Sequence, residues 1–295
     1  MEKISVYIPC YNAERFIVKA VRSILAQTLS PAEVLVIDDG CTDRSIELIA
    51  KFPVKVISMG GNQGLAAARN RAYKEAKNEL IASIDADCEA HPEWLEQLVK
   101  AFPLDCAGTG GKNIEANQKK IADRWRAQHM PLHWGDQSVL NPKVIYGGNQ
   151  LFRKSSIFQV GLLDTSKVTE DYKIGIEDLE LSRKLYSAGY KLFYNPKAVV
   201  YHLRTDTPAS IIRQYWRWSV FYYPVPIRLP VFFLKVGINL LKAVKHVVDD
   251  IVRREPRLIP ISLRIFPFHT LYDFRHLRNF RNRHAKLSHS RFSGG

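Results

Sequence analysis

The sequence contains little cysteine and no long hydrophobic run. Its 295 residues include only four cysteines, and their spacing is neither paired nor that of metal ligands: Cys10, Cys41, Cys88 and Cys106. This spacing predicts reduced, buried thiols rather than a disulfide framework. Beyond residue 218 no apolar run approaches the roughly 18 to 20 residues of a membrane span. The first residues, MEKISVYIPC, lack the basic head and long apolar stretch of a secretory leader, so we expect a cytoplasmic chain.

Acidic residues are scarce at the C-terminal end. The whole chain carries 43 Lys and Arg against 29 Asp and Glu, a net charge of +14. From Arg253 onward there are ten Lys and Arg against two Asp and Glu, so about +8 of that charge lies in the last 43 residues. The rest of the chain is only mildly basic. This distribution predicts a basic tail, and it gives no separate reason to expect nucleic acid as a partner.

Apolar, β-rich runs alternate with helical periodicity along the N-terminal third. The run ISVYIP precedes AERFIVKAVRSILAQ, and one helical face of the latter holds Phe16, Ile17, Ala20, Val21, Ile24 and Leu25. Three further pairs follow: EVLVIDD with DRSIELIAKF, VKVIS with GLAAARNRAYKEA, and LIASIDAD with PEWLEQLVKAF. Four successive strand–helix units predict an α/β fold, in which a mostly parallel sheet is flanked by helices on both faces. The short apolar strands fit burial on both sides.

Polar clusters stand at the ends of these strands, where such sheets bind ligands: PCYNAE, DDGCTD and DAD. A lone D-x-D pair is more often a solvated turn or a helix cap. Residues i and i+2 of a strand share a face, however, so we expect the carboxylates of Asp85 and Asp87 to point to one spot at the sheet edge. Two adjacent like charges are unfavourable unless a cation or a proton joins them. We therefore predict a divalent cation, Mg²⁺ or Mn²⁺, that also binds the oxygens of a diphosphate ligand.

Five segments, in this order, resemble family 2 glycosyltransferases, the inverting enzymes of the GT-A fold. They are VYIPCYNAERFIVKAVRSILAQTLSPAEVLVIDDGCTDRS, NQGLAAARNRA, IDADCEAHPEWL, GGNQLFRKSSIFQVGLLDT and IEDLELSRKLYSAGYKLFYNPKAVVYH. The resemblance covers about residues 3 to 218. We therefore predict a GT-A, Rossmann-like catalytic domain over residues 1–220, followed by a basic, amphipathic helical extension over residues 221–295.

The resemblance implies a pocket for a nucleotide-diphospho-sugar donor. Its residues here are Pro9, Tyr11, Asp39, Arg69, Asp85 and Asp87. The segment from Asp38 to Asp43 also suits a capped strand-to-helix turn that needs no ligand. Arg69 is equally consistent with a surface ion pair. The implied metal ligands are Asp87 and His202, although a lone histidine at a strand end is more often structural.

Transfer with inversion needs a base that takes the proton of the acceptor hydroxyl. In IEDLELSRKL the resemblance gives this catalytic role to Asp178, and Glu177 beside it would raise its proton affinity by like charge. An acidic helix N-terminus explains the same pair without catalysis. The implied acceptor site consists of Gly148, Asn149, Glu177, Gln214, Arg217 and Trp218.

The expected activity is transfer of a sugar from the donor to a hydroxyl of a glycan or lipid-linked acceptor, in polysaccharide or glycolipid biosynthesis. The alternative is a non-catalytic nucleotide-sugar or membrane-binding module. A sugar-phosphate nucleotidyltransferase would need a glycine-rich, basic phosphate loop after the first strand, and PCYNAERF is not one. Nucleic-acid binding by the tail ranks last.

The tail also carries a helical pattern. After Val231, polar residues recur at spacings of three or four: Lys235, Asn239, Lys242, Lys245, His246, Asp249 and Arg253. The remaining face is apolar, which predicts an amphipathic helix. Most such helices bury the apolar stripe in their own protein. The aromatic YYPVPIRLPVFF before it and the arginine-rich segment after it favour an anionic surface instead, that is, peripheral association with the inner face of the cell membrane.

Overall fold

The structure is a computed structural model, and it describes residues 3–100, 102–103, 105–165, 177–220 and 229–290. The chain forms two compact units. The first comprises Met1–Asn117 and Pro131–Arg204, and the second comprises Gln118–Met130 and Thr205–Gly295. The predicted functional boundary at residue 220 stays a prediction.

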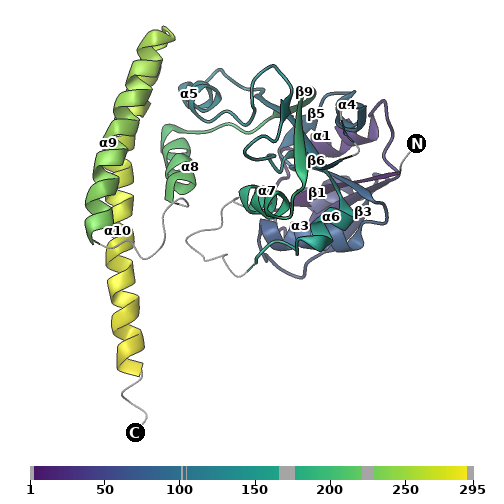
Figure 1. Ribbon diagram of the computed structural model, residues 1–295, viewed down its shortest axis with the longest axis horizontal. Helices are drawn as coiled ribbons and strands as arrows, with labels where there is room; N and C mark the ends of the chain where they lie inside the picture. The colour runs from purple at the N-terminus through teal and green to yellow at the C-terminus, as the bar shows by residue number, and fades with distance from the viewer. Residues whose placement is uncertain (1–2, 101, 104, 166–176, 221–228, 291–295) are drawn as a thin grey trace. The chain divides into compact units, whose positions relative to one another are not determined.

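One mixed sheet organises the first unit (Figure 1). Its strands are β1 (Ile4–Cys10), β2 (Glu33–Asp38), β3 (Lys55–Ser58), β4 (Leu80–Ile84), β5 (Cys88–Ala90), β6 (Cys106–Glu115), β7 (Val139–Leu140), β8 (Asn149–Arg153) and β9 (Lys191–His202). They are ordered β3-β2-β1-β4-β8-β6-β9-β5, and β7 pairs with β9. The pairs among β1 to β4 and the pair β6 with β9 are parallel, whereas β8 is antiparallel to both of its neighbours. The predicted mostly parallel α/β sheet is confirmed.

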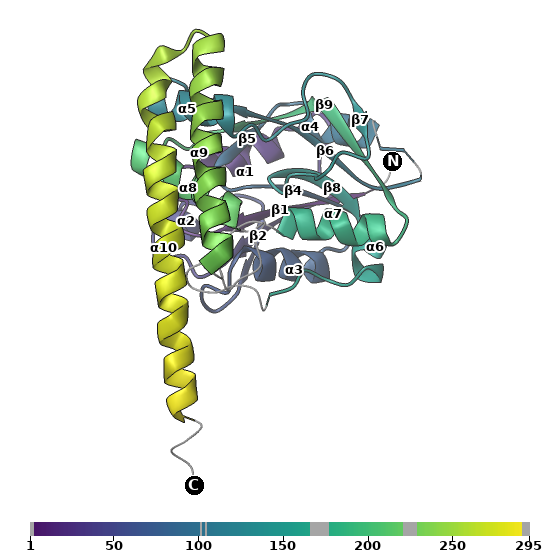
Figure 2. The same cartoon turned by 60° about the vertical axis from the view of Figure 1, so that its left-hand side comes forward.

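Helices cover both faces of this sheet. They are α1 (Ile17–Leu25), α2 (Ser45–Ile49), α3 (Leu65–Glu75), α4 (Trp94–Lys100), α6 (Lys154–Gln159) and α7 (Glu177–Ser187). One buried apolar cluster packs α1, α2 and α4 on the sheet, and a second packs α3, α6 and α7 on the opposite face. Figure 2 shows α3, α6 and α7 grouped on one side.

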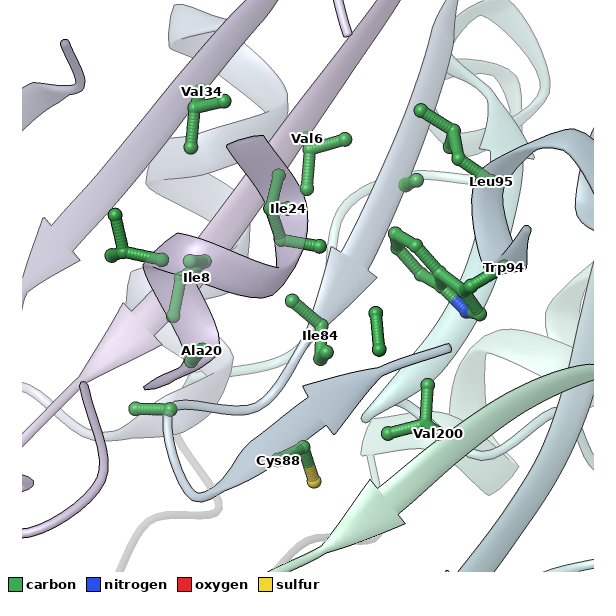
Figure 3. Packing of buried hydrophobic residues seen from close by; sticks show 14 of the residues in the cluster. Val6, Ile8, Ala20, Ile24, Val34, Ile84, Cys88, Trp94, Leu95 and Val200 are labelled. Carbon is green, nitrogen blue, oxygen red and sulfur yellow. The ribbon is translucent and has the colours of Figure 1, made fainter. Parts of the chain in front are cut away.

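The amphipathic pattern of α1 explains how the first cluster forms. Its residues Ile17, Ala20, Val21 and Ile24 are fully buried, as the spacing predicts. Figure 3 shows Ala20 and Ile24 of this helix beside strand residues such as Val6, Ile8 and Ile84. Every residue of β1 and β4 is buried, which confirms the expectation for these two strands. The expectation is wrong for β3, because β3 is an edge strand with three of its four residues exposed.

The second unit is helical. It contains α5 (Ile121–His129), α8 (Pro208–Val220), α9 (Leu229–Val252), the short 3₁₀ helix η2 (Pro256–Leu258) and α10 (Ile259–Ser290). The predicted C-terminal helical extension is present, and α9 and α10 lie side by side as an antiparallel pair (Figures 1 and 2). None of the described helices combines the length and the apolarity that crossing a bilayer requires. Of the predicted aromatic segment YYPVPIRLPVFF, residues 222–228 lie outside the described residues, and residues 229–233 belong to α9.

Candidate active site

The ends of β1 and β2 carry three of the predicted donor residues. Pro9 is buried in β1, and Tyr11 follows the strand with 51% of its surface exposed. Asp39 is buried, and its carboxylate accepts hydrogen bonds from the backbone N–H groups of Gln63, at 2.7 Å, and Gly64, at 2.9 Å. Asp39 therefore fixes the backbone just before α3, a structural role that needs no ligand. Its predicted contact with the donor stays a prediction.

The D-A-D segment forms a turn rather than a strand end. Strand β4 stops at Ile84, and the chain turns through residues 85–87 into β5, which pairs with β9. The expectation that both carboxylates share a strand face is therefore wrong. Instead, Asp85 lies near Arg69, and Asp87 lies near His202. Each carboxylate of the pair is neutralised by a cationic side chain of the protein itself.

Arg69 is the centre of the first cluster. This α3 residue is 2% exposed, so a surface ion pair is excluded. Its guanidinium forms an ion pair with Asp178 and lies 3.4 Å from Glu177 Oε1 and 3.6 Å from Asp85 Oδ1. Burial opposes the positive charge, but attraction to Asp178 and Glu177 outweighs burial and raises the pKa of Arg69 well above its usual value. One cation thus brings together three carboxylates from two separate segments.

Asp178 stands at the start of α7. One of its carboxylate oxygens contacts Arg69, and the other accepts a hydrogen bond of 2.8 Å from the backbone N–H of Gly147. The side chain is 19% exposed, so a hydroxyl group can reach it. Glu177 is buried, and desolvation raises the pKa of its carboxyl group although Arg69 lowers it. Desolvation likewise raises the pKa of Asp85, to about 6.

Two consecutive glycines make room for this cluster. A Cβ atom on Gly148 would lie 2.5 Å from Asp85 Oδ2, and one on Gly147 would overlap the guanidinium of Arg69. The next residue, Asn149, is fully buried: its amide oxygen accepts a hydrogen bond of 2.8 Å from Trp94, and its amide nitrogen donates to backbone carbonyls. These contacts give Gly148 and Asn149 structural roles, and their contact with an acceptor stays a prediction.

A second cluster joins Asp87, His202 and Glu115. His202 Nε2 lies 3.3 Å from Asp87 Oδ2, and His202 Nδ1 lies 2.8 Å from Glu115 Oε2. Burial alone would lower the pKa of His202, but its hydrogen bonds to the two carboxylates raise it to about 10. Burial raises the pKa of Asp87, but the hydrogen bond and the charge of His202 lower it by more, so the pKa falls below its usual value. Glu115 was not predicted from the sequence, although this acidic residue also ends a strand; it stands beside His202 in the β6–β9 ladder.

The second cluster fits a divalent metal ion. Asp87 offers a hard carboxylate oxygen, and Nε2 of His202 offers a nitrogen ligand when a metal ion replaces its proton. Glu115 holds the other ring nitrogen of His202, as carboxylates do for many metal-bound histidines. Another group of possible ligands, His129, His246 and Asp249, lies in the second unit, with ligand atoms within 4.8 Å of one another. This group was not predicted from the sequence.

Three predicted acceptor residues lie in α8 of the second unit. Gln214 accepts a hydrogen bond of 2.8 Å from Arg126, Arg217 is exposed, and Trp218 packs against an apolar cluster. Their role toward an acceptor stays a prediction.

Comparison with known proteins identifies relatives of this chain. The family model described as glycosyl transferase family 2 matches residues 5–160. The poly-beta-1,6-N-acetyl-D-glucosamine synthases of Staphylococcus epidermidis and Staphylococcus aureus (strain COL) are each 28% identical over 231 residues. Those matches cover 74% of this chain and 54% of each synthase, so the chain spans about half the length of the curated relatives it matches.

Solved structures show the same architecture. Staphylococcus aureus TarS aligns with a TM-score of 0.57 and 17% identity over 94% of this chain and 54% of TarS. The mannosyltransferase PcManGT from Pyrobaculum calidifontis, solved with GDP-Man and Mn²⁺, aligns with a TM-score of 0.57 and 17% identity over 90% and 74% of the two chains. The likeness confirms the predicted GT-A fold. Because the family model also matches more than half of the residues, the chain belongs to glycosyl transferase family 2.

Proposed function

We propose that this chain is a metal-dependent, inverting glycosyltransferase. It would move a sugar from a nucleotide-diphospho-sugar donor to a hydroxyl of a glycan or lipid-linked acceptor. The observation that carries this proposal is one continuous set of contacts: Asp178 pairs with Arg69, Arg69 reaches Asp85, and Asp87 of the same turn contacts His202. These contacts would join the proposed base, donor site and metal site.

In the proposed reaction, Asp178 takes the proton of the acceptor hydroxyl while the hydroxyl oxygen attacks the anomeric carbon. The bond from that carbon to the diphosphate oxygen breaks, and the nucleoside diphosphate leaves with the bonding electrons. Contacts with Arg69 and the Gly147 N–H hold the Asp178 carboxylate in one orientation. A divalent ion held by Asp87 and His202 would supply positive charge for the leaving diphosphate.

Relatives support the choice of substrates. PcManGT was solved with GDP-Man and Mn²⁺, which supports a nucleotide-sugar donor and a divalent metal here. The names of the staphylococcal synthases support a role in polysaccharide biosynthesis. The proposed acceptor site comprises Gly148, Asn149, Glu177, Gln214, Arg217 and Trp218. Peripheral association with the inner face of the cell membrane is part of the proposal, and it would place a lipid-linked acceptor near the enzyme.

The test is turnover of UDP-, GDP- and dTDP-sugars with and without Mn²⁺, together with thermal stabilisation of the protein by each donor. Asp178→Asn should keep donor binding and lower turnover by a factor of about 10² to 10⁴. Glu180→Gln is the matched control, because Glu180 lies in the same helix and pairs with Lys184 at 3.1 Å. Donor binding without turnover by the unaltered protein would favour the non-catalytic module. Normal turnover by Asp178→Asn would exclude Asp178 as the base.

A further inference from the structure

Helix α9 packs with its polar side inward. Its buried residues are Lys235, Asn239, Ala243, His246 and Asp250, and four of these five are polar or charged. They recur at intervals of three and four and so form one stripe along the helix. Nine large apolar side chains of the same helix are 48% to 74% exposed, among them Phe233, Leu241 and Val252. Among the exposed residues of α9, only Lys245 is charged.

One buried polar cluster holds the first half of this stripe. The carboxylate of Asp273 in α10 accepts hydrogen bonds from Lys235 at 2.5 Å, from Asn239 at 2.9 Å and from the indole of Trp216 in α8 at 3.0 Å. The side chains of Lys235 and Asp273 are only 3% and 1% exposed. These polar groups of α9 therefore depend on partners within the second unit.

Another buried polar cluster holds the second half. Asp250 accepts a hydrogen bond of 2.6 Å from Ser262 in α10 and lies 2.7 Å from His129 in α5. His246 contacts His129 at 2.8 Å and the hydroxyl of Tyr215 at 2.9 Å. Turning α9 so that its apolar side faced inward would leave these buried groups without partners, which is unfavourable. The orientation of the helix within the unit is therefore set by its polar contacts.

This arrangement is the reverse of that expected in water. A fold in water gains most of its stability by removing apolar surface from the solvent, and α9 instead presents that surface outward. Polar and ionisable side chains that pair inside a helical bundle, with apolar side chains outside, are typical of helices that contact lipid. A contiguous exposed apolar face marks an interaction surface. The α9 face thus requires an apolar partner.

The charges of the second unit indicate which partner. Among its described residues, none of the six Asp and Glu is exposed, whereas ten Lys and Arg are, including Arg253, Arg254 and Arg257. After Arg275 the sequence adds five more Lys and Arg and no acidic residue. An outward surface that is apolar along α9 and otherwise cationic matches an anionic phospholipid bilayer, which offers acyl chains and negative headgroups together.

We infer that the exposed apolar face of α9 docks on an anionic phospholipid bilayer, with the helix in the plane of the interface. Its apolar side chains enter the acyl region, and the exposed Arg and Lys residues of the unit meet the headgroups. The helix lies on the bilayer without crossing it. Delivery of a lipid-linked acceptor by this contact rests on the proposed function, whereas the lipid contact itself does not.

Fluorescence locates the docking face directly. The full chain carrying Leu241→Trp is compared with one carrying Leu140→Trp, since Leu140 is similarly exposed, at 55%, but lies in β7 of the first unit. The vesicles are an equal mixture of phosphatidylcholine and phosphatidylglycerol, with or without bromine on the acyl chains. We expect a blue shift and bromine quenching beyond that of the parent chain for Leu241→Trp alone. Emission of Leu241→Trp that is already blue-shifted without vesicles would overturn the inference, because protein would then cover the face. Equal quenching of the two variants would also overturn it, because it would indicate non-specific adsorption.

Vesicle sedimentation tests the energetic role of the same face. Phe233→Gln with Leu241→Gln should weaken partition at least about tenfold. The matched control, Leu140→Gln with Phe158→Gln, removes exposed side chains of the same two types from the first unit and should leave partition unchanged. Equal partition of both double variants would contradict the inference. Donor turnover by the unaltered chain without vesicles is measured alongside, and its absence would count against the proposed chemistry but not against the lipid contact.

Discussion

Replacement of Arg69 tests whether charge holds the active site together. Arg69→Met keeps an apolar side chain of moderate length but removes the guanidinium that faces Asp85, Glu177 and Asp178. The Arg69 side chain is 3% exposed and that of Glu177 6%, so water has little access to Glu177 once the cation is lost. Removal of one partner from a buried ion pair costs about 3–5 kcal/mol. We expect the free energy of unfolding of the first unit to decrease by about that amount at pH 7.

The loss of stability caused by Arg69→Met should be smaller at low pH than at neutral pH. Burial already raises the pKa of Asp85 to about 6 and raises that of Glu177, while the charge of Arg69 lowers both. Without Arg69 both pKa values rise further above their unfolded values of about 4. Carboxyl groups whose pKa is raised by folding favour the folded state at low pH and oppose it as pH increases. The difference between parent and variant is therefore expected to shrink from pH 7 to pH 5.

Urea unfolding at both pH values measures this difference. The control is Arg71→Met in the same helix, because Arg71 is 46% exposed and pairs with Glu75 one turn away, at 3.0 Å. Removal of this surface pair should change stability by less than about 1 kcal/mol. A loss for Arg69→Met no greater than that of the control, or an identical loss at both pH values, would refute the reasoning.

Three further outcomes are expected. Asp87→Asn or His202→Gln should abolish the Mn²⁺ dependence of turnover while the protein stays folded. Titration of turnover with Mn²⁺ measures this dependence. An unchanged Mn²⁺ response in both variants would rule out Asp87 and His202 as the metal ligands. Gly148→Ala should destabilise the first unit by about 1–3 kcal/mol, because the added Cβ atom meets a carboxylate at 2.5 Å, and an unshifted melting temperature would contradict it. Burial lowers the pKa of His246 and of His269 to about 3, so the unfolded chain alone takes up protons below about pH 6.5. The free energy of unfolding of the second unit should therefore fall by about 2 kcal/mol for each histidine between pH 7 and pH 5. Urea unfolding at both pH values measures this change. Equal stability at the two pH values would be inconsistent with buried neutral imidazoles.

Much of the sheet could be predicted because its signals are local. The buried strands β1 and β4 are continuous apolar runs, and the apolar spacing of α1 is visible within nine residues. The parallel order of β1 to β4 follows from the strand–helix alternation. The edge position of β3 could not be read in this way, because it depends on which strands lack a neighbour on one side.

The partners of the acidic residues could not be predicted. Arg69 and Asp178 are 109 residues apart, and His202 and Glu115 are 87 apart, so no local pattern links them. The sequence identifies Asp85 and Asp87 as a pair that needs cations. The turn after Ile84 sends the two carboxylates to different cations, and only the paths of α3 and β9 decide which.

Helix α9 shows most clearly which features the sequence determines and which the tertiary structure decides. The sequence by itself determines a helix with one polar and one apolar stripe, because side-chain periodicity is a property of the local chain. Tertiary structure decides which stripe faces inward. Asp273 in α10 and His129 in α5 offer hydrogen-bonding partners to the polar stripe, and buried polar groups without such partners are costly. The apolar stripe is outward because these distant partners hold the opposite side of the helix.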